Sequence, residues 1–331
     1  MCRDYISYLR SHCAAKLRQI ALLLYRPVVI ISLYAFVGAN LMSDRILITG
    51  ATGNVGSQLA HTLLEQGAAV RIGAHNIGKA RQQFQDVTDI VHFDFLQSAT
   101  FEAAFADVKR LFLVRPPALA NVERDIQPAL SAAVNAGVEH FVFLSIQGVE
   151  NNRFVPHYKI EQAILELNVD YTFLRAGFFM QNLSTTNCQE IRDDNKIALP
   201  VGKAKTSFID VRDIADVAAV ALTTTEHFNK AYTLTGPEAL DYFAIADKLS
   251  KVLGRPIQYT NPSLIGFAWQ QIRQGKSLIY AVVVSGLYTL TRIGNAKHVS
   301  NDVEHILGRT AISFDDFALD YKACWMANES I

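Results

Sequence analysis

The feature that most constrains the fold is an apolar run that passes directly into a glycine-rich turn. The segment Ile46–Gly56 reads Ile-Leu-Ile-Thr-Gly-Ala-Thr-Gly-Asn-Val-Gly. Gly50 permits a tight turn, Gly53 lets backbone N–H groups approach a diphosphate, and Gly56 lets a helix pack close to the preceding strand. The next apolar positions are spaced as on one face of a helix, at Leu59, Ala60, Leu63 and Leu64. The pattern predicts a strand, a phosphate-binding loop and a helix whose N-terminus faces a dinucleotide, and a bare structural turn is the alternative.

Strands and helices alternate along the chain after this unit. We expect strands at 45–49, 69–72, 89–93, 110–114, 140–145, 171–175, 206–211 and 231–234. We expect helices at 54–66, 98–106, 120–136, 157–167 and 213–222. Apolar strands joined by helices of this length favour right-handed crossovers and parallel pairing. The fold class is therefore predicted as α/β, a Rossmann-type doubly wound parallel sheet with a smaller, mainly helical C-terminal lobe. The ligand is expected at the carboxyl ends of the strands.

Three segments describe the predicted domain organisation. Residues 43–235 form the dinucleotide-binding domain, with 181–205 contributing to the cleft, and residues 236–331 form a substrate lobe. Within the lobe, Leu278–Leu290 is apolar but contains Gly286 and is too short to span a bilayer, which takes about 20 residues. We expect it to be a buried helix over the cleft.

Residues 1–42 are predicted to be an extension outside the fold. They carry five basic residues and one acidic residue, and the uncharged run from Val28 to Leu41 is shorter than a bilayer span. A membrane anchor and a cleaved signal peptide are the alternatives. A cytoplasmic location is expected, with anchoring by this apolar segment as the second choice.

Composition excludes some classes of function. Of the 31 basic and 31 acidic residues, 26 and 30 lie beyond residue 42, so the body is mildly acidic and we expect no nucleic-acid partner. The four cysteines are scattered without metal-ligand spacing, so we expect neither a metal site nor a disulfide framework. A membrane partner is expected only through residues 1–42, and the sequence leaves a homodimer open.

The loop spacing Gly-x-x-Gly-x-x-Gly and four later segments resemble a known family. They are FLVRPP at 112–117, VPHYKIE at 155–161, YTFLRAGFFMQNL at 171–183 and FIDVRD at 208–213. In this order they resemble the signatures of the NmrA-like family of atypical short-chain dehydrogenase/reductases, over about residues 43 to 325. The resemblance implies NAD(P) binding and a quinone-reductase-like activity.

The second strand of such folds selects the cofactor. An acidic residue at its end binds the ribose 2′-hydroxyl of NAD, whereas a cation suits the 2′-phosphate of NADP. Here residues 72–81 contain no carboxylate, and His75 stands where the family usually has arginine. We therefore expect NADP, with NAD as the second choice.

The residues implied for cofactor contact lie at the ends of successive strands and in the loop. They are Gly50, Thr52, Gly53, Asn54, Val55, Gly56, His75, Asn76, Lys79, Asp94, Phe95, Arg115, Pro116, His157, Gly177 and Phe178. A surface salt bridge is the alternative for Arg115, and a solvated basic surface is the alternative for His75, Asn76 and Lys79.

The usual proton donor of the superfamily is missing. None of the twelve tyrosines has a lysine four residues later, as the Tyr-x-x-x-Lys pair requires. Ser145 ends a predicted strand where the superfamily keeps its catalytic serine. His157 opens the next helix, where it is a candidate for binding the nicotinamide ribose, for donating a proton, or for both; an exposed histidine is the alternative.

A conjugated acceptor spreads the negative charge that hydride transfer creates, so it tolerates the loss of a general acid. We therefore expect NAD(P)H-dependent reduction of a conjugated, mostly apolar small molecule, quinone-like in kind. Its pocket would be lined by Phe178, Phe179, Met180, Trp269 and Tyr288, for which core packing is the alternative. The competing hypothesis is a non-catalytic NAD(P)-binding regulator that reports redox state to a protein partner.

Overall fold

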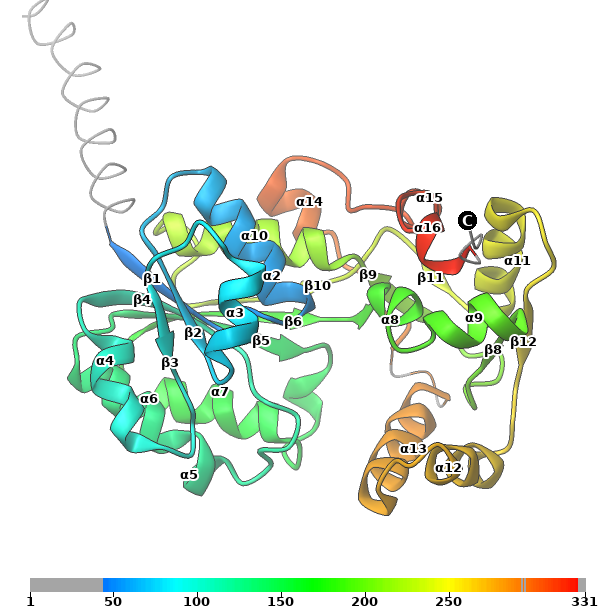
Figure 1. Ribbon diagram of the computed structural model, residues 1–331, viewed down its shortest axis with the longest axis horizontal. Helices are drawn as coiled ribbons and strands as arrows, with labels where there is room; N and C mark the ends of the chain where they lie inside the picture. The colour runs from blue at the N-terminus through cyan, green and yellow to red at the C-terminus, as the bar shows by residue number, and fades with distance from the viewer. Residues whose placement is uncertain (1–43, 293, 295, 327–331) are drawn as a thin grey trace, which may run out of the picture. The chain divides into compact units, whose positions relative to one another are not determined.

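The computed structural model describes residues 44–292, 294 and 296–326 (Figure 1). The chain from Arg45 onward forms one compact unit. The extension, the anchor and the signal peptide considered for residues 1–42 lie outside the described residues.

A seven-stranded parallel sheet forms the centre of the larger part of this unit. Its order is β10-β6-β5-β4-β1-β2-β3, and every neighbouring pair is parallel. The strands are β1 (Arg45–Thr49), β2 (Val70–Ala74), β3 (Ile90–His92), β4 (Val108–Leu113), β5 (His140–Ile146), β6 (Asp170–Ala176) and β10 (Lys230–Leu234). The order reverses between β1 and β4, which is the switch point of a doubly wound sheet. The predicted fold class is confirmed.

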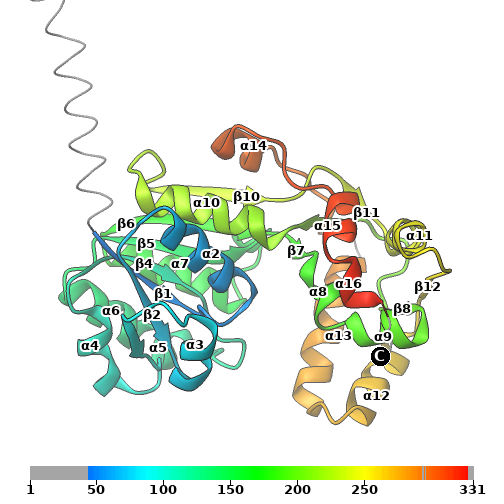
Figure 2. The ribbon, with the colours of Figure 1, turned by 45° about the horizontal axis from the view of Figure 1, so that its top comes forward.

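Helices cover both faces of this sheet (Figure 2). One face carries α2 (Asn54–Glu65), α3 (Ile77–Gln83) and α10 (Val211–Thr223). The other carries α4 (Phe101–Phe105), α6 (Gln127–Asn135) and α7 (Pro156–Glu166).

Two hydrophobic cores result from the alternation of side chains along each strand. Ile46 and Ile48 belong to the core under α2 and α10, whereas Leu47 between them belongs to the core under α6 and α7. All three side chains are fully buried, as expected for a strand with both faces covered.

Several helix boundaries differ from the sequence expectation for local reasons. The helix expected at 120–136 is divided into α5 (Val122–Asp125) and α6, because Pro128 lacks an N–H and sits in the first turn of α6. The helix expected at 98–106 begins as a 3₁₀ turn (Ser98–Thr100) before α4. Helix α3, which begins after the Asn76 cap, was not expected.

A smaller lobe is built from two stretches of chain. Its core joins Leu183, Ile191 and Ile197 from the first stretch with Leu249 and Trp325 from the second. Its elements are β7 (Phe178–Phe179), α8 (Gln181–Ser184), α9 (Cys188–Asp194), β8 (Lys196–Ala198), β9 (Thr206–Ile209), β11 (Ala239–Leu240), α11 (Tyr242–Leu253), β12 (Gln258–Thr260), α12 (Leu264–Arg273), α13 (Leu278–Arg292), α15 (Phe314–Asp320) and α16 (Lys322–Trp325). Helix α14 (Asp302–Leu307) instead packs against α10 and β10 of the larger part. The domain boundary at residue 235 stays a prediction.

The strand expected at 206–211 does form, but the prediction that it returns to the large sheet was wrong. Strand β9 pairs with β7 and β11 in a separate three-stranded sheet. The edge of β6 is already occupied by β10, which pairs with it from Lys230 to Leu234. A strand offers one hydrogen-bonding edge to each side, so β9 has no place there.

The expectation for Leu278–Leu290 was correct for secondary structure and wrong for burial. The segment lies in α13, yet Leu278, Val282 and Val283 have exposed fractions of 66%, 61% and 64%. Over the described part of the chain, no helix combines the length and the apolar character that crossing a bilayer requires.

We predict that a chain starting at Met42 folds and binds the dinucleotide as well as the full chain does. The reason is that β1, its loop and every core residue described here belong to the unit that begins at Arg45. Thermal unfolding followed by circular dichroism, together with a dinucleotide titration, provides the measurement. A shortened chain that is unfolded, or that binds at least tenfold more weakly, contradicts the prediction.

Candidate dinucleotide site and its neighbouring polar groups

The glycine-rich loop turns sharply at the carboxyl end of β1 and leaves the start of α2 open. Gly50 adopts a φ of +65°, in the left-handed region that favours glycine. The Gly53 N–H donates to the Gly50 carbonyl at 2.9 Å, and α2 begins at Asn54. No side chain caps this twelve-residue helix at Gly53, and both Gly53 and Asn54 are exposed. Uncapped N–H groups at a helix N-terminus are suited to bind a phosphate.

Gly56 is required by packing. A Cβ atom at Gly56 would lie 2.4 Å from the Gly50 carbonyl oxygen, a distance that real structures do not tolerate. A Cβ atom at Gly53 would lie 3.2 Å from the same oxygen, which needs only a small adjustment. The two glycines therefore differ: Gly56 lets the helix meet the loop, and Gly53 leaves space on the open side. Thr52 is half-buried and Val55 packs in the core under α2.

Thr49, which was not among the residues expected to contact the cofactor, ties the loop to the switch point. Its hydroxyl donates to the Phe112 carbonyl at 3.0 Å and accepts from the Val114 N–H at 2.9 Å. Thr49 is 1% exposed, so these bonds are shielded from water. They hold the ends of β1 and β4 together where the dinucleotide is expected. A threonine at the end of an apolar strand, directly before the first glycine, is the signal that was available.

The residues expected to select the cofactor lie together beside this loop. Asn76 caps α3 by accepting from the Lys79 N–H at 2.9 Å, and the Lys79 ammonium donates to the Thr52 carbonyl at 3.4 Å. His75 is exposed and its Nδ1 lies 3.3 Å from a carboxylate oxygen of Asp94. Two side chains that can carry positive charge therefore border the loop, together with one carboxylate.

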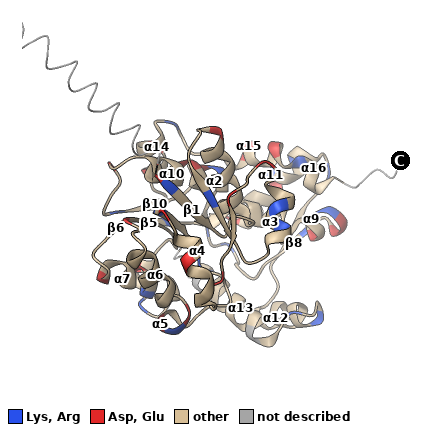
Figure 3. Cartoon of the chain, turned by 60° about the vertical axis from the view of Figure 1, so that its left-hand side comes forward, with Lys and Arg blue, Asp and Glu red and all other residues tan. Residues whose placement is uncertain are grey.

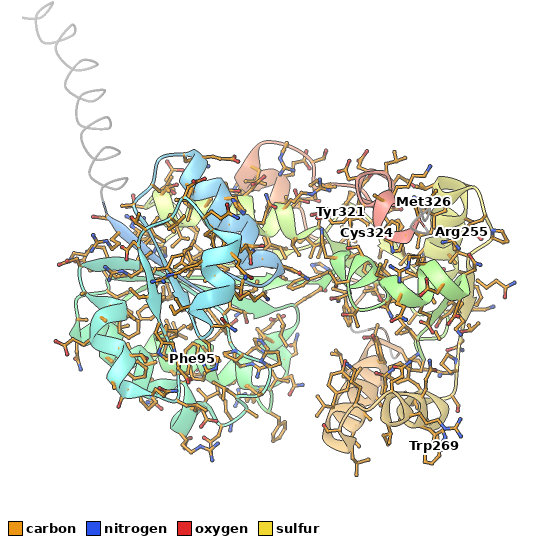
Figure 4. The ribbon with its side chains drawn as sticks, viewed as in Figure 1. Phe95, Arg255, Trp269, Tyr321, Cys324 and Met326 are labelled. Atoms are coloured by element: carbon orange, nitrogen blue, oxygen red, sulfur yellow. The ribbon has the colours of Figure 1, made fainter. Side chains whose placement is uncertain are left out.

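Asp94 and Phe95, expected to contact the adenine, have different surroundings. The Asp94 carboxylate accepts from the Leu96 N–H at 2.9 Å and from the Gln97 amide at 2.8 Å, so it also organises its own turn. Phe95 is 7% exposed and packs edge to face on Phe93, with ring centroids 4.8 Å apart (Figure 4). An adenine contact by Phe95 stays a prediction.

Arg115 holds the loop after β4. One of its Nη atoms donates to the carbonyls of Pro116, Pro117 and Leu119, each at 3.0 Å. Its Nε is buried without a hydrogen-bond partner, and burial lowers the pKa of the guanidinium. The residue therefore fixes the Pro116–Pro117 wall and keeps one unused buried donor at the carboxyl end of the sheet.

His157 is the second residue of α7 and is half-buried rather than exposed. Its ring stacks on Phe143, with centroids 6.0 Å apart and an interplanar angle of 25°. Burial, and to a smaller extent the positive charge of Arg115, lowers the pKa of His157 to about 4. The imidazole is therefore neutral at physiological pH and can donate or accept one hydrogen bond.

Ser145 is engaged in a buried network that sequence analysis did not foresee. Its hydroxyl donates to Glu161 at 2.6 Å, and Arg175 donates to both oxygens of the same carboxylate at 3.2 and 2.8 Å. Ser145 and Glu161 are 1% and 2% exposed. Glu161 lies four residues after His157, hence on the same side of α7. The spacing was visible in the sequence, but the partners come from β5 and β6 and were not.

Gly177 follows β6 at a close approach of two chain segments. A Cβ atom there would lie 2.5 Å from the Ser207 carbonyl oxygen. Phe178 begins β7 and pairs with Phe208 in β9. The two residues thus form the passage from the large sheet into the lobe, and their contact with a cofactor stays a prediction.

The residues expected to line one acceptor pocket are brought together only in part, since Phe178 and Tyr288 pack against the lobe core that contains Met180. Met180 is buried in the lobe core, whereas Trp269 is 59% exposed on the outer side of α12 (Figure 4). Tyr288 packs edge to face on Phe267, with centroids 5.4 Å apart. Phe178 and Phe179 are half-buried and remain candidates.

An open cavity of about 600 Å³ lies elsewhere, at the amino ends of β5 and β6. Its lining includes Glu139, Asp170 and Tyr171. In doubly wound sheets the ligand binds at the opposite edge, where the loop and His157 lie.

Comparison with known proteins agrees with this arrangement. The sequence profile of the NmrA-like family matches residues 42–302. The chain belongs to the NmrA-like family. The NAD(P)H azoreductase of Xenophilus azovorans is 33% identical over 289 residues, which cover 85% of this chain and 99% of the azoreductase. An agroclavine dehydrogenase of Claviceps fusiformis is 30% identical over 304 residues, covering 86% and 99% of the two chains.

Solved structures of other proteins share the fold. The NADPH-dependent quinone oxidoreductase of Escherichia coli bound to NADPH superposes with a TM-score of 0.75 at 21% identity, over 82% of this chain and 98% of that one. The Citrobacter triphenylmethane reductase bound to NADP(H) gives 0.73 at 22% identity, over 83% and 99%. At such identities these structures bear on the fold alone.

We predict that Gly53→Val and Gly56→Ala fail in different ways. The valine side chain should occupy the space of a phosphate and raise the Kd for the dinucleotide about tenfold or more, with little loss of stability. The Gly56→Ala methyl group should collide with the Gly50 carbonyl and destabilise the fold by about 1–3 kcal/mol. Titration and urea unfolding of both variants provide the measurement, and unchanged binding by a folded Gly53→Val variant contradicts the phosphate site.

Proposed function

We propose that this member of the NmrA-like family is an NAD(P)H-dependent oxidoreductase that reduces a conjugated, mostly apolar small molecule. The observation that carries the proposal is the open N-terminus of α2 above the Gly50–Gly56 loop at the switch point of the sheet. The bound dinucleotide supplies the hydride. The activities in the names of the relatives, azoreductase and agroclavine dehydrogenase, support the same class of reaction.

The groups of this chain fit such a cofactor. Backbone N–H groups of residues 54–56 bind the diphosphate, because no side chain caps the first turn of α2 and only the Gly53 N–H is already used, by the Gly50 carbonyl. The unpartnered Nε of Arg115 and the His157 imidazole lie at the carboxyl end of the sheet, where they bind and orient the nicotinamide half. NADP is preferred over NAD because Lys79 and His75 border the loop on the side of the adenine ribose.

The acceptor class follows from the proton donors that the site lacks. The sequence holds no Tyr-x-x-x-Lys pair, the Ser145 proton is donated to Glu161, and His157 is neutral at physiological pH. An isolated ketone would need an acid as its alkoxide develops. A quinone or an azo compound delocalises the charge and takes its proton from water after the hydride has arrived.

The experiment that tests this proposal is steady-state oxidation of NADPH with a panel of quinones, azo dyes and isolated ketones. We expect turnover with the first two classes and none with the third. Tight cofactor binding without turnover of any acceptor would overturn the enzyme proposal and favour a redox-sensing role through a protein partner. Efficient reduction of isolated ketones would contradict the acceptor class.

Replacement of Lys79 tests the cofactor preference. The variant Lys79→Ala should raise the Kd for NADPH about tenfold and leave the Kd for NADH nearly unchanged, because only NADPH carries the 2′-phosphate. Lys159→Ala is the matched control, since Lys159 is an exposed lysine on α7. Equal losses for both dinucleotides would show that Lys79 acts only through the loop carbonyl that it contacts.

Replacement of His157 separates cofactor positioning from acid catalysis. We expect His157→Ala to raise the Kd for NADPH more than it lowers kcat at saturating cofactor. Loss of a general acid would instead lower kcat by about 10²-fold or more with binding intact. His61→Ala, at an exposed histidine, is the control.

The lowered pKa of His157 also predicts how pH acts. Because the folded pKa is about 4 and the ordinary value is 6.5, kcat should show no inflection from His157 between pH 5.5 and 8. The unfolded chain binds the proton first, so the contribution to stability is complete above about pH 6.5 and is lost as pH falls toward 4. A kcat profile with a His157-dependent inflection near 6.5 contradicts the neutral imidazole.

A further inference from the structure

Helix α13 exposes an uncharged face on the side opposite to its packing contacts. Its inner side packs on the lobe, since Ala281 is fully buried and Val284 and Tyr288 contact the lobe core. Successive residues of a helix are rotated by about 100°, so positions 282, 283, 286 and 289 lie on the opposite side. This side, called here the outer face, consists of four exposed residues: Val282, Val283, Gly286 and Thr289.

The outer face is directed toward the larger part of the protein. In Figures 1 and 2, α13 lies on the side of the lobe that is nearer to the large sheet, and α12 lies on its far side. Phe267 of α12 packs edge to face on Tyr288, so α12 covers the inner side of α13 and leaves the outer face free. Val282 and Val283 have exposed fractions of 61% and 64%. Exposed apolar side chains directed toward a proposed reaction centre are suited to contact an apolar ligand.

The chain that follows α13 reaches the carboxyl ends of β5 and β6. The Ala296 carbonyl accepts from the Ser207 N–H at 2.7 Å, and the His298 carbonyl accepts from the Gln147 amide at 2.8 Å. Gln147 directly follows β5, and a Cβ atom at Gly177, directly after β6, would lie 3.5 Å from its Oε1. The C-terminal end of α13 therefore leads to the edge of the sheet where the nicotinamide half is proposed to bind.

Four exposed cations lie around this end of α13. They are Lys203, Lys205, Arg292 and Lys297, called here the cation group. A Cβ atom at Gly202 would lie 3.7 Å from the Nε of Arg292, so the last residue of α13 lies beside the turn that carries Lys203. The hydrogen bond between Ser207 and Ala296 brings the segments of Lys205 and Lys297 together in the same way.

The chain does not neutralise the cation group. Residues 195–209 and 278–301, which supply all four cations, contain no Asp or Glu (Figure 3). Among the residues that the structure describes, none of the four has an ion-pair partner. Two carboxylates of neighbouring segments are already engaged: Glu150 pairs with Arg175 at 3.3 Å, and Glu190 accepts from the Ala198 N–H at 3.1 Å. The negative end of the α13 dipole, about half a charge, is smaller than four positive charges, so this region attracts an anion.

We propose that the outer face of α13 and the cation group together bind the acceptor, and that the acceptor carries an anionic group on an apolar aromatic ring system. The ring system lies on Val282 and Val283, and a sulfonate, carboxylate or phosphate meets the cations at the C-terminal end of the helix. The inference rests on the proposed function and adds the charge and the orientation of the acceptor to it.

Equilibrium binding of two inert aromatic probes tests the anion preference without any turnover. The probes are 2-naphthalenesulfonate and 2-naphthol, which share one ring system and differ in charge at pH 7. Calorimetric titration of the full chain, saturated with NADP⁺, should give a Kd about tenfold or more lower for the sulfonate. The difference should shrink when NaCl is raised from about 50 to about 500 mM, because salt screens exposed charges.

Two variants separate the charged and the apolar contributions. The double variant Lys203→Ala/Arg292→Ala should weaken binding of the sulfonate about tenfold more than binding of 2-naphthol. Lys251→Ala, at an exposed lysine on α11, is its matched control. Val283→Asn should weaken binding of both probes to a similar extent, because both place the same rings on α13. Leu319→Asn is the control, since Leu319 is 60% exposed on α15.

A matched pair of acceptors links the surface to the reaction. Steady-state oxidation of NADPH is measured with 1,4-naphthoquinone and with 1,4-naphthoquinone-2-sulfonate. The wild type should show the lower KM for the sulfonated quinone, and the double variant should lose that advantage.

Three outcomes overturn the inference. The first is a wild type that binds the sulfonate no more tightly than 2-naphthol, and the second is a double variant that keeps the wild-type preference. The third is a double variant whose affinity for NADPH falls as much as its affinity for the sulfonate, which would assign the cations to the cofactor.

Failure of the inference and failure of the proposed function are distinguishable. Reduction of both quinones with equal KM values overturns the inference and leaves the oxidoreductase proposal in place. Absence of turnover with either quinone instead contradicts the proposed function, and the titrations with the two inert probes then decide whether this surface binds an aromatic anion.

Discussion

The close approach of α2 to the end of β1 is the constraint on which the candidate site depends. Because Gly56 has no side chain, the first turn of the helix lies against the Gly50 carbonyl, where even a methyl group would stand at 2.4 Å. This contact brings the helix N-terminus, with its unused N–H groups, to the switch point of the sheet. The buried hydroxyl of Thr49 then holds β1 to β4 at the same place. The groups proposed to bind the dinucleotide are positioned from this junction.

Burial determines the chemistry of the polar groups next to this junction of β1, β4 and α2. The imidazole of His157 stacks on Phe143, and its pKa of about 4 keeps it neutral at physiological pH. It can therefore orient a ligand but does not act as a cationic proton donor. The Ser145 hydroxyl is donated to a carboxylate that Arg175 neutralises from the other side. A buried network of this kind keeps its geometry because every member has a partner. Its rigidity suits a reaction in which the cofactor supplies the hydride and the acceptor stabilises its own charge.

The lobe buries large apolar side chains in a core of its own and exposes other apolar side chains to solvent. Its inner side is a core of large side chains that includes Phe314, Phe317 and Trp325, all fully buried. Its α12–α13 hairpin leaves much apolar surface outside that core. The core therefore does not account for the exposed apolar side chains of α13.

Local sequence patterns were sufficient to predict the elements that short-range interactions determine. The strand, the phosphate-binding loop and the helix that begins at Asn54 were predicted from residues 46–64, because turn geometry and side-chain period are short-range properties. Family membership could be predicted for the same reason, since its signatures are short segments. Tertiary structure alone decided the rest. Strand β9 does not join the large sheet, because β10 occupies the edge of β6. Strand β10 begins 21 residues after the last residue of β9. The partner of Ser145, the pKa of His157 and the exposure of α13 depend on residues that are distant in sequence and adjacent only after folding.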